Sequence, residues 1–296
     1  MNVNHVPVLL KESIEALTVI PGQRYIDATV GAGGHAREII HAGGILLGID
    51  QDENALEIAR VTLGDTTKTK DSTWSWKLIH GNFKDIETLA KKEEFTDVDG
   101  ILFDLGVSSM QLDTPKRGFS YRFTDAPLDL RMDASGGDTA AQLVNRVGQE
   151  ELYDIFSTYG EEQLARKLAD AAVRARAVKR IQTVGDLIDI VKTVAPNEGM
   201  RYGVLSRVFQ GIRIAVNDEL GSLKKGLNGA QRLLAPGGRL VVISFHSLED
   251  RMVKQYMRQS GWEIVTRHPI RPTDTEMYEN SRSRSAKMRV AIKKPV

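Results

Sequence analysis

Short apolar runs that end in an acid or a glycine recur along the chain, and helical patterns follow them. These runs predict strands over residues 24–27, 44–50, 74–80, 99–104 and 239–245, with residues 262–266 and 288–292 as edge strands. Amphipathic spacing predicts helices over residues 54–63 and 248–260. Nearly continuous apolar strands that alternate with helices favour an α/β fold, in which helices cover both faces of a parallel sheet.

The alternation stops in the middle of the chain. Residues 105–135 are rich in Gly, Ser, Pro and Asp, which predicts loops. Residues 139–194 have helical periodicity without a strand pattern. We therefore expect a helical domain over residues 125–200, inserted into an α/β domain that residues 1–124 and 201–296 form together.

Composition narrows the class of protein. With 41% hydrophobic and 27% charged residues among 296, the chain has enough apolar material for a full core, which excludes a disordered chain. Lys and Arg number 40 against 39 Asp and Glu, so any nucleic-acid binding must come from a local patch. No apolar run approaches ~18 residues, and residues 1–17 lack the pattern of a signal peptide. We expect a cytoplasmic protein with no membrane span.

The chain contains no cysteine, which excludes disulfides, thiolate metal ligands and thiol nucleophiles. The six histidines are scattered, and no H-x-x-x-H pair would share a helix turn, so we expect no metal site.

A strand, a glycine turn and a helix start follow one another over residues 25–36. Glycine allows positive φ and a close approach to the backbone, and the helix start offers free N–H groups. Asp50 ends the next strand 19 residues after Gly31 (50 − 31 = 19), where a carboxylate can accept hydrogen bonds from ribose hydroxyls. This arrangement favours a nucleoside-containing cofactor; the alternative is a tight structural turn.

Two cofactors fit the turn. Gly31-x-Gly33-x-x-Ala36 satisfies the dinucleotide fingerprint of a nicotinamide-dependent oxidoreductase. S-adenosylmethionine instead needs a partner for its methionine ammonium, which Asp27 suits, while Asp104 ends a strand where a central crevice opens. The Pro-Gly-Gly turn of residues 234–240 is typical of S-adenosylmethionine-dependent methyltransferases and favours methyl transfer. Without a cysteine to attack carbon 5 of a pyrimidine, the acceptor is an amine, amide or hydroxyl.

Motifs along nearly the whole chain resemble the ribosomal RNA small subunit methyltransferase H family. The longest of them are Asp-Leu-Gly-Val-Ser-Ser at 104–109 and Ser-Phe-His-Ser-Leu-Glu-Asp-Arg at 244–251. The other matching segments are 5–10, 33–35, 48–50, 99–103, 111–113, 117–120, 127–133, 159–162, 209–214 and 280–285. The chain departs from the family pattern at residues 200–208 and at Gly211, where Ala is common.

The resemblance implies a Rossmann-like, class I S-adenosylmethionine-dependent methyltransferase with an inserted helical domain for substrate recognition. It implies methylation of the N4 amine of a cytidine in the decoding (P-site) region of 16S ribosomal RNA, with that RNA or the 30S subunit as partner. A homodimer is one alternative for the oligomeric state. By motif match, the cofactor contacts fall on Gly33, Gly34, His35, Asp50, Phe83, Asp104 and Gln111.

Two residues are candidates for catalysis. Asp104 could accept hydrogen bonds from the cytosine amine and favour an attacking nitrogen, or it could only bind the cofactor. His246 could orient the base, or it could only support the helix start over residues 247–250. Asp129, Arg131 and Asp133 could order a lid or meet RNA, or form internal ion pairs.

Two basic segments are candidates for phosphate binding, and a solvated surface is the alternative for both. The first has six positive residues opposed only by Asp170 within the same stretch, and few aromatic residues accompany either segment. The first comprises Arg166, Lys167, Arg174, Arg176, Lys179 and Arg180, and the second includes Arg282 and Arg284. Besides the methyltransferase and the oxidoreductase, a non-catalytic RNA-binding or assembly module on a vestigial fold is a third alternative.

Overall fold

The computed structural model describes residues 7–64 and 75–295. The chain divides into two compact units. Met1–Gly106 and Leu220–Val296 form what we call the sheet unit, and Val107–Glu219 form the helical unit.

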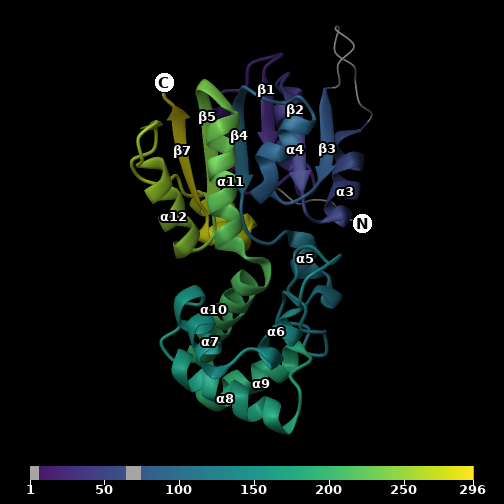
Figure 1. Ribbon diagram of the computed structural model, residues 1–296, viewed down its shortest axis with the longest axis vertical. Coiled ribbons are helices and arrows are strands. Elements are labelled where there is room, and N and C mark those ends of the chain that lie inside the picture. Colours follow the sequence, from purple (N-terminus) through teal and green to yellow (C-terminus); the bar gives the residue numbers. More distant parts are fainter. Residues whose placement is uncertain (1–6, 65–74, 296) are drawn as a thin grey trace. The chain divides into compact units, whose positions relative to one another are not determined.

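The sheet unit contains a seven-stranded sheet with the order β3-β2-β1-β4-β5-β7-β6 (Figure 1). The first five strands are parallel, and β7 runs antiparallel to β5 and β6. All seven predicted strands are present, with bounds shifted by a few residues. The prediction of residues 288–292 as an edge strand is wrong, because β7 pairs with β5 on one side and with β6 on the other. Trp74, at the predicted start of the third strand, lies outside the described residues. The strands are β1 (Arg24–Asp27), β2 (Ile45–Asp50), β3 (Trp76–His80), β4 (Val98–Asp104), β5 (Leu234–Ser244), β6 (Trp262–Ile264) and β7 (Lys287–Lys293).

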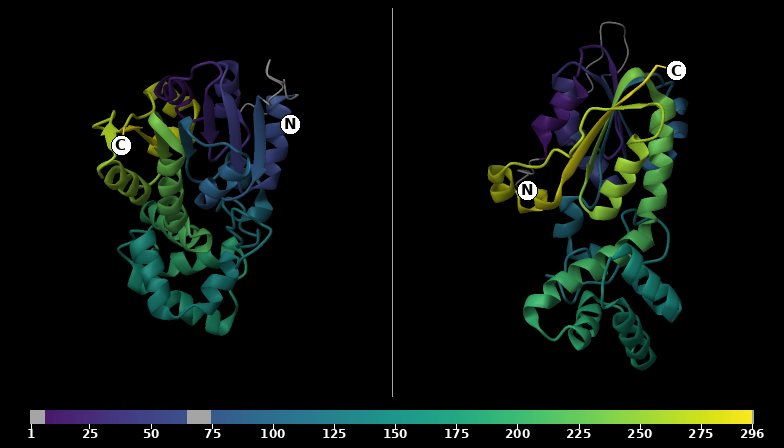
Figure 2. Two further views of the ribbon diagram at one scale, coloured as in Figure 1. Left: turned by 45° about the horizontal axis from the view of Figure 1, so that its top comes forward. Right: turned by 90° about the vertical axis from the view of Figure 1, so that its left-hand side faces the viewer.

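Helices cover both faces of this sheet (Figure 2). Side chains alternate along a strand, so Ile26 joins a core with α4, α11 and α12, while its neighbour Tyr25 joins a second core with α1, α2 and α3. The predicted helices over 54–63 and 248–260 correspond to α3 and α12. The helices are α1 (Leu10–Leu17), α2 (Gly34–His41), α3 (Glu53–Leu63), η1 (Phe83–Asp85), α4 (Ile86–Lys92), α11 (Glu219–Leu233), α12 (Ser247–Met257), α13 (Asp274–Glu279) and η4 (Ser281–Ser285).

The helical unit has its own apolar core, and the helical prediction over 139–194 is confirmed. It begins earlier and ends later than the predicted 125–200. Phe119 is buried in this core and α10 supplies Val204 and Ile212, so the preceding loop and the following long helix fold with the insertion. Its elements are α5 (Ser109–Asp113), η2 (Pro115–Arg117), α6 (Ala140–Arg146), α7 (Gln149–Asp154), the π-helical turn η3 (Ile155–Tyr159), α8 (Ala165–Val178), α9 (Val184–Val194) and α10 (Glu198–Asn217).

The divergent stretch before Phe209 forms a regular helix. Asn197 caps α10, because its side chain accepts hydrogen bonds from the N–H groups of Gly199 and Met200. A Cβ at Gly211 would lie only 2.7 Å from the carbonyl oxygen of Ile155 and 3.0 Å from the nitrogen of Gly160. Glycine at 211 therefore lets α10 pack directly against the backbone of η3.

Within residues 7–64 and 75–295, no helix is long and apolar enough to cross a membrane.

Candidate active site

The strand order reverses at β1, and ligands of open α/β sheets bind outside the carboxyl ends of strands at such a point. β1 lies between β2 and β4, with Asp27 paired in register with Gly48 on one side and Leu102 on the other. Asp27, Asp50 and Asp104 are the last residues of these three strands. The topology thus brings three of the predicted site residues to one edge of the sheet.

The glycines of the first turn serve different purposes. Gly31 and Gly33 have φ of 52° and 86°, the left-handed region that favours glycine. A Cβ on Gly33 would approach α3 to 3.3 Å at Ala59, and a Cβ on Gly34 would overlap the ring of Pro7 at 2.1 Å. The turn is therefore closely packed, and its close neighbours at Gly33 and Gly34 are protein atoms.

Asp50 holds the glycine turn against the end of β2. Its Oδ2 accepts a hydrogen bond from Gly31 N at 2.8 Å, and its Oδ1 accepts one from Asp52 N at 2.9 Å. Burial raises the pKa of Asp50 to about 6, although these two hydrogen bonds act in the opposite direction. Each oxygen keeps a further lone pair, which could accept from a hydroxyl.

Asp27 is a buried acid with incomplete hydrogen bonding. Its Oδ1 accepts from Thr29 N at 3.2 Å, whereas its buried Oδ2 has no hydrogen-bond partner in the described part of the chain. Burial raises the pKa of Asp27 to about 7, and the nearby charge of Asp50 adds to this rise. A buried carboxylate with a free oxygen is suited to a cationic ligand.

Asp104 shares these features. Its backbone N–H donates to Thr29 Oγ1 at 2.6 Å, and among the described residues its buried Oδ1 has no hydrogen-bond partner. Burial, together with the charges of Asp27 and Glu249, raises the pKa of Asp104 well above its usual value. Several acids therefore share one poorly solvated region.

His35 lies beside Asp104 at the start of α2. Its Nε2 donates to the carbonyl oxygen of Val8 at 3.2 Å, and its Nδ1 lies 3.9 Å from Asp104 Oδ2. His35 thus links the N-terminal segment to the strand-end acids.

His246 forms the N-cap of α12, as the structural alternative predicts. Its Nδ1 accepts from Glu249 N at 3.4 Å, and Glu249 Oε2 accepts from the N–H groups of Phe245 and His246 at 2.8 and 3.2 Å. Sequence reasoning placed the cap in residues 247–250 and missed that Glu249 is a buried acid whose charge acts on Asp104. The Glu three residues after His246 is the capping-box spacing, which could have signalled it.

Phe83 and Gln111 occupy different units. The Phe83 ring packs edge-on against Phe103 with ring centroids 5.7 Å apart, and a Cβ at Gly226 would lie 2.9 Å from it. This packing fixes the ring near the end of β3. Gln111 belongs to the helical unit, where its side chain completes the capping box of α5 with Ser108.

The first basic segment is largely paired within the helical unit. Arg166 contacts Glu150 at 2.6 Å and stacks over the Tyr153 ring at 3.9 Å. Arg174 pairs with Asp170, Arg176 donates to the carbonyl oxygen of Val144, and Lys179 pairs with Asp186 at 2.9 Å. Lys167 and Arg180 are exposed on and after α8.

The second basic segment forms η4, where Arg282 and Arg284 lie in a 3-10 turn. Arg289, further along, is buried and pairs with Asp250 at 2.6 Å. In the helical unit, Asp129 and Arg131 form the internal ion pair that was one of the two alternatives, at 2.8 Å.

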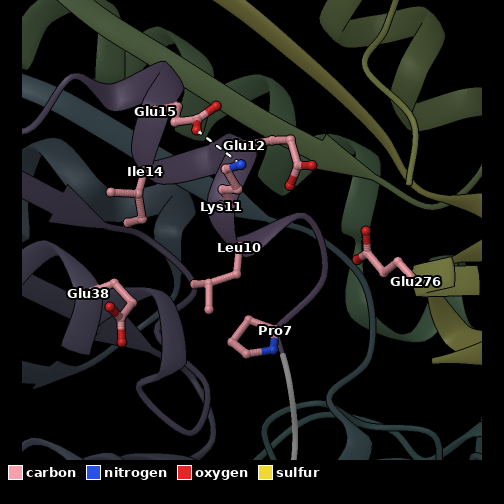
Figure 3. A pocket seen from close by; sticks show the side chains of 8 residues that line it. All are labelled: Pro7, Leu10, Lys11, Glu12, Ile14, Glu15, Glu38 and Glu276. Carbon is pink, nitrogen blue, oxygen red and sulfur yellow. Dashed lines mark ion pairs between the residues drawn. The ribbon is translucent and has the colours of Figure 1, made fainter. Parts of the chain in front are cut away.

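A hollow of about 580 Å³ lies along α1 in the sheet unit, lined mainly by acids and apolar residues. Figure 3 shows Lys11 paired with Glu15 at its rim and Glu276 on the opposite side. It contains none of the predicted site residues, so the strand-end acids remain the candidate site.

A seven-stranded sheet in the order 3-2-1-4-5-7-6, with its seventh strand reversed and acids at the ends of its central strands, defines a Rossmann-like methyltransferase. The chain belongs to the MraW methylase family, whose model matches residues 2–294. The nicotinamide-dependent oxidoreductase is therefore not favoured.

Three curated relatives have the name ribosomal RNA small subunit methyltransferase H. The protein from Symbiobacterium thermophilum is 45% identical, over 99% of this chain and 98% of its own length. The protein from Deinococcus radiodurans is 44% identical, over 97% and 89%, and the protein from Bacteroides fragilis is 43% identical, over 98% and 97%.

Proposed function

We propose that this protein transfers the methyl group of S-adenosylmethionine to the N4 amine of a cytidine in the decoding region of 16S ribosomal RNA. The family is one of methylases, and the three relatives are named for the RNA of the small ribosomal subunit. The choice of N4 follows from the resemblance and agrees with the absence of cysteine, since attack on carbon 5 requires a thiol.

The residues of the site fit this cofactor. Asp50 would accept from the ribose hydroxyls, and Gly31, Gly33, Gly34 and His35 form the turn beside it. Phe83 would pack against the adenine, since its ring is held at the end of β3. Asp27 would hold the methionine ammonium with its free Oδ2.

The single observation that carries the proposal is the pair of buried oxygens on Asp27 and Asp104 that lack a hydrogen-bond partner within the described residues. Such atoms are costly in a folded protein unless a ligand completes them. A ligand with an ammonium and a sulfonium would supply positive charge at an acidic site.

Asp104 has the chemistry to assist the transfer. When bound, S-adenosylmethionine supplies an electrophilic methyl group on a positively charged sulfur. The lone pair of the cytosine amine is delocalised into its ring, so an acceptor on its N–H favours attack. As the N–C bond forms, the C–S bond breaks with its electron pair on sulfur, and the nitrogen must lose a proton. Asp104 Oδ1 would accept that proton; a raised pKa brings a carboxylate closer to the basicity that proton acceptance at neutral pH requires.

The helical unit and η4 would contact the RNA. Lys167 and Arg180 are exposed, and Arg166, Arg174, Arg176, Arg282 and Arg284 complete the set of proposed phosphate contacts. A homodimer stays a prediction, which light scattering of the purified protein would test.

The test is incubation with labelled S-adenosylmethionine and small subunits that lack the modification, followed by digestion and nucleoside analysis. We expect label only in N4-methylcytidine, with fully modified subunits as the matched control. Label in another nucleoside would overturn the substrate, and tight binding of NAD in place of S-adenosylmethionine would overturn the reaction. Cofactor binding without methyl incorporation into subunits or naked RNA would favour the non-catalytic alternative.

A further inference from the structure

We propose that Tyr202 and the residues around it form a stacking surface for an unstacked base of single-stranded RNA. The surface consists of Tyr202, Tyr121, Arg201 and Arg122, all in the helical unit, and we call it the aromatic surface. Its geometry stands alone, but the choice of RNA as occupant rests on the proposed function.

Three rings from two segments meet at this surface. Tyr202, near the start of α10, packs edge-on against Tyr121 with centroids 5.5 Å apart and an interplanar angle of 89°. Tyr121, from the loop before α6, packs in turn against Phe209 at 5.7 Å. Phe209 is buried in the core, so the outermost ring is held by a supported stack.

The outermost ring remains exposed. Tyr202 is 66% exposed and Met200 is 50% exposed, although Tyr121, against which Tyr202 packs, contacts the apolar core. Because Tyr121 already restricts the Tyr202 ring, that ring loses little conformational freedom when a base stacks on its exposed side. Burial and a hydrogen bond with Tyr202 raise the pKa of Tyr121, which keeps that hydroxyl neutral.

Arginines are the chain neighbours of two of these rings: Arg201 precedes Tyr202, and Arg122 follows Tyr121. Arg201 donates to the carbonyl oxygens of Ala195 and Pro196, contacts that add no negative charge. Arg122 lies over the Phe123 ring at 5.6 Å and stays 63% exposed while it pairs with Asp113. Aromatic rings beside arginines are the combination that recognises splayed bases and their phosphates, and this favours RNA over an apolar protein segment.

In the sequence, few aromatic residues accompany the basic segments, which favours base stacking in the catalytic domain. In the fold, Tyr121 and Tyr202 pack against each other within the helical unit, so this proposal places a base-stacking site there instead.

The experiment compares Tyr202→Ala, Tyr202→Trp and the control Val61→Ala, which truncates an 83% exposed side chain on α3, away from the segments proposed to contact RNA. The probe is a short fluorescein-labelled single-stranded oligoribonucleotide with the target cytidine's flanking sequence, and its binding is followed by anisotropy. We expect Tyr202→Ala to weaken binding about 5- to 150-fold, the range for loss of one stacked base. Tyr202→Trp and Val61→Ala should bind as the wild type does.

Two further readouts separate stacking from a structural or electrostatic role. The dependence of affinity on salt should not change in Tyr202→Ala, because no phosphate contact is removed. With small subunits as substrate, KM for the subunit should rise while KM for S-adenosylmethionine stays constant. Unchanged RNA binding by Tyr202→Ala would overturn the proposal.

The remaining outcomes are also decisive. If Tyr202→Ala impairs methylation of assembled subunits but not binding of naked RNA, a ribosomal protein is the occupant and the RNA proposal is wrong. If the wild-type protein methylates no substrate while the pattern of RNA binding holds, the proposed function fails and the aromatic surface stands.

Discussion

In the helical unit, the buried carboxylate of Glu162 accepts from Arg207 Nε at 2.7 Å and from Leu164 N at 2.7 Å. Asn217 accepts from Met132 N at 2.7 Å and donates to the carbonyl oxygen of Leu130 at 2.8 Å. In the sheet unit, by contrast, the strand-end acids Asp27 and Asp104 each keep one buried oxygen with no partner in residues 7–64 and 75–295.

The difference separates polar groups that hold a fold together from those kept for a ligand. Glu162 and Asn217 stabilise loops and helices, because the hydrogen bonds that join them to described residues all lie within their own unit. Asp27 and Asp104 raise the free energy of the folded protein until a cation or donor arrives.

The largest effect should follow from Asp104→Asn. An amide cannot take the amine proton, so we expect kcat to fall by about 10²- to 10⁴-fold at saturating cofactor. Asp99→Asn, at the other end of β4, is the matched control and should leave kcat unchanged. Single-turnover kinetics and cofactor titration check this. A loss of affinity with normal turnover would assign Asp104 to cofactor binding alone.

The stability of the cofactor-free protein should fall as pH rises from about 4 to 7. The folded pKa of Asp27 is about 7, above the ordinary value of 3.8, so the folded state binds more protons in this window. Once Asp27 is ionised in both the folded and the unfolded protein, its pKa shift has lowered the free energy of unfolding by about 4 kcal/mol. The tryptophans of the described residues, Trp76 and Trp262, lie in β3 and β6 of the sheet unit, so urea unfolding followed by tryptophan fluorescence at pH 5 and pH 8 measures it.

Asp27→Asn should flatten this dependence and weaken cofactor binding at the same time. Asp250→Asn should change the pH dependence of stability in the opposite direction. Its pKa is lowered because the hydrogen bond and charge of Arg289 outweigh its burial, so it stabilises the fold above the ordinary pKa and less as pH falls. An Asp27→Asn variant with the wild-type pH profile would show that the acid is not a strained, ligand-ready group.

Gly211→Ala should destabilise the helical unit by about 1–3 kcal/mol, because the added methyl group would overlap the backbone of η3. Hydrogen exchange of the α10 amides measures it, while the tryptophan-detected midpoint of the sheet unit should not move. Gly136→Ala is the control, since its Cβ would meet nothing within 4 Å. Unchanged exchange in Gly211→Ala would mean that the helix and the turn readjust.

The smallest effects concern the first basic segment. Lys167→Ala and Arg180→Ala should each reduce the salt dependence of RNA binding by about one ion, because each variant leaves one phosphate without its cation. Arg166→Ala should change the salt dependence less, because Glu150 already neutralises the Arg166 side chain. Breaking this exposed ion pair should cost under about 1 kcal/mol. Filter binding to 16S RNA at several salt concentrations checks the ranking, and equal effects for all three would contradict it.

The sheet was predictable because each strand is a short apolar run, and its order follows from crossovers that place β1 beside both β2 and β4. The acids of the site were predictable for the same reason: Asp27, Asp50 and Asp104 end such runs. Local patterns carry this information, since parallel strands align their carboxyl ends.

What local patterns miss depends on partners distant in sequence. Arg166 and Lys179 look unopposed along α8, but Glu150 and Asp186 arrive from neighbouring helices. Gly211 looks like a poor helix residue until the backbone of η3 is placed against it. Loop residues such as Phe119 belong to the helical unit because of tertiary burial, which no spacing within residues 105–135 reveals.

The reversed strand β7 has a consequence for synthesis of the chain. β5 pairs with β4 on one side and with β7 on the other, so one edge of β5 stays open until residues 287–293 leave the ribosome. Until then Val241 and Ile243 lie on a strand that could pair with another nascent chain. The helical unit is complete before β7 is synthesised. We therefore expect the sheet unit of the methylase to depend on a chaperone, or on rapid completion of translation, more than the helical unit does.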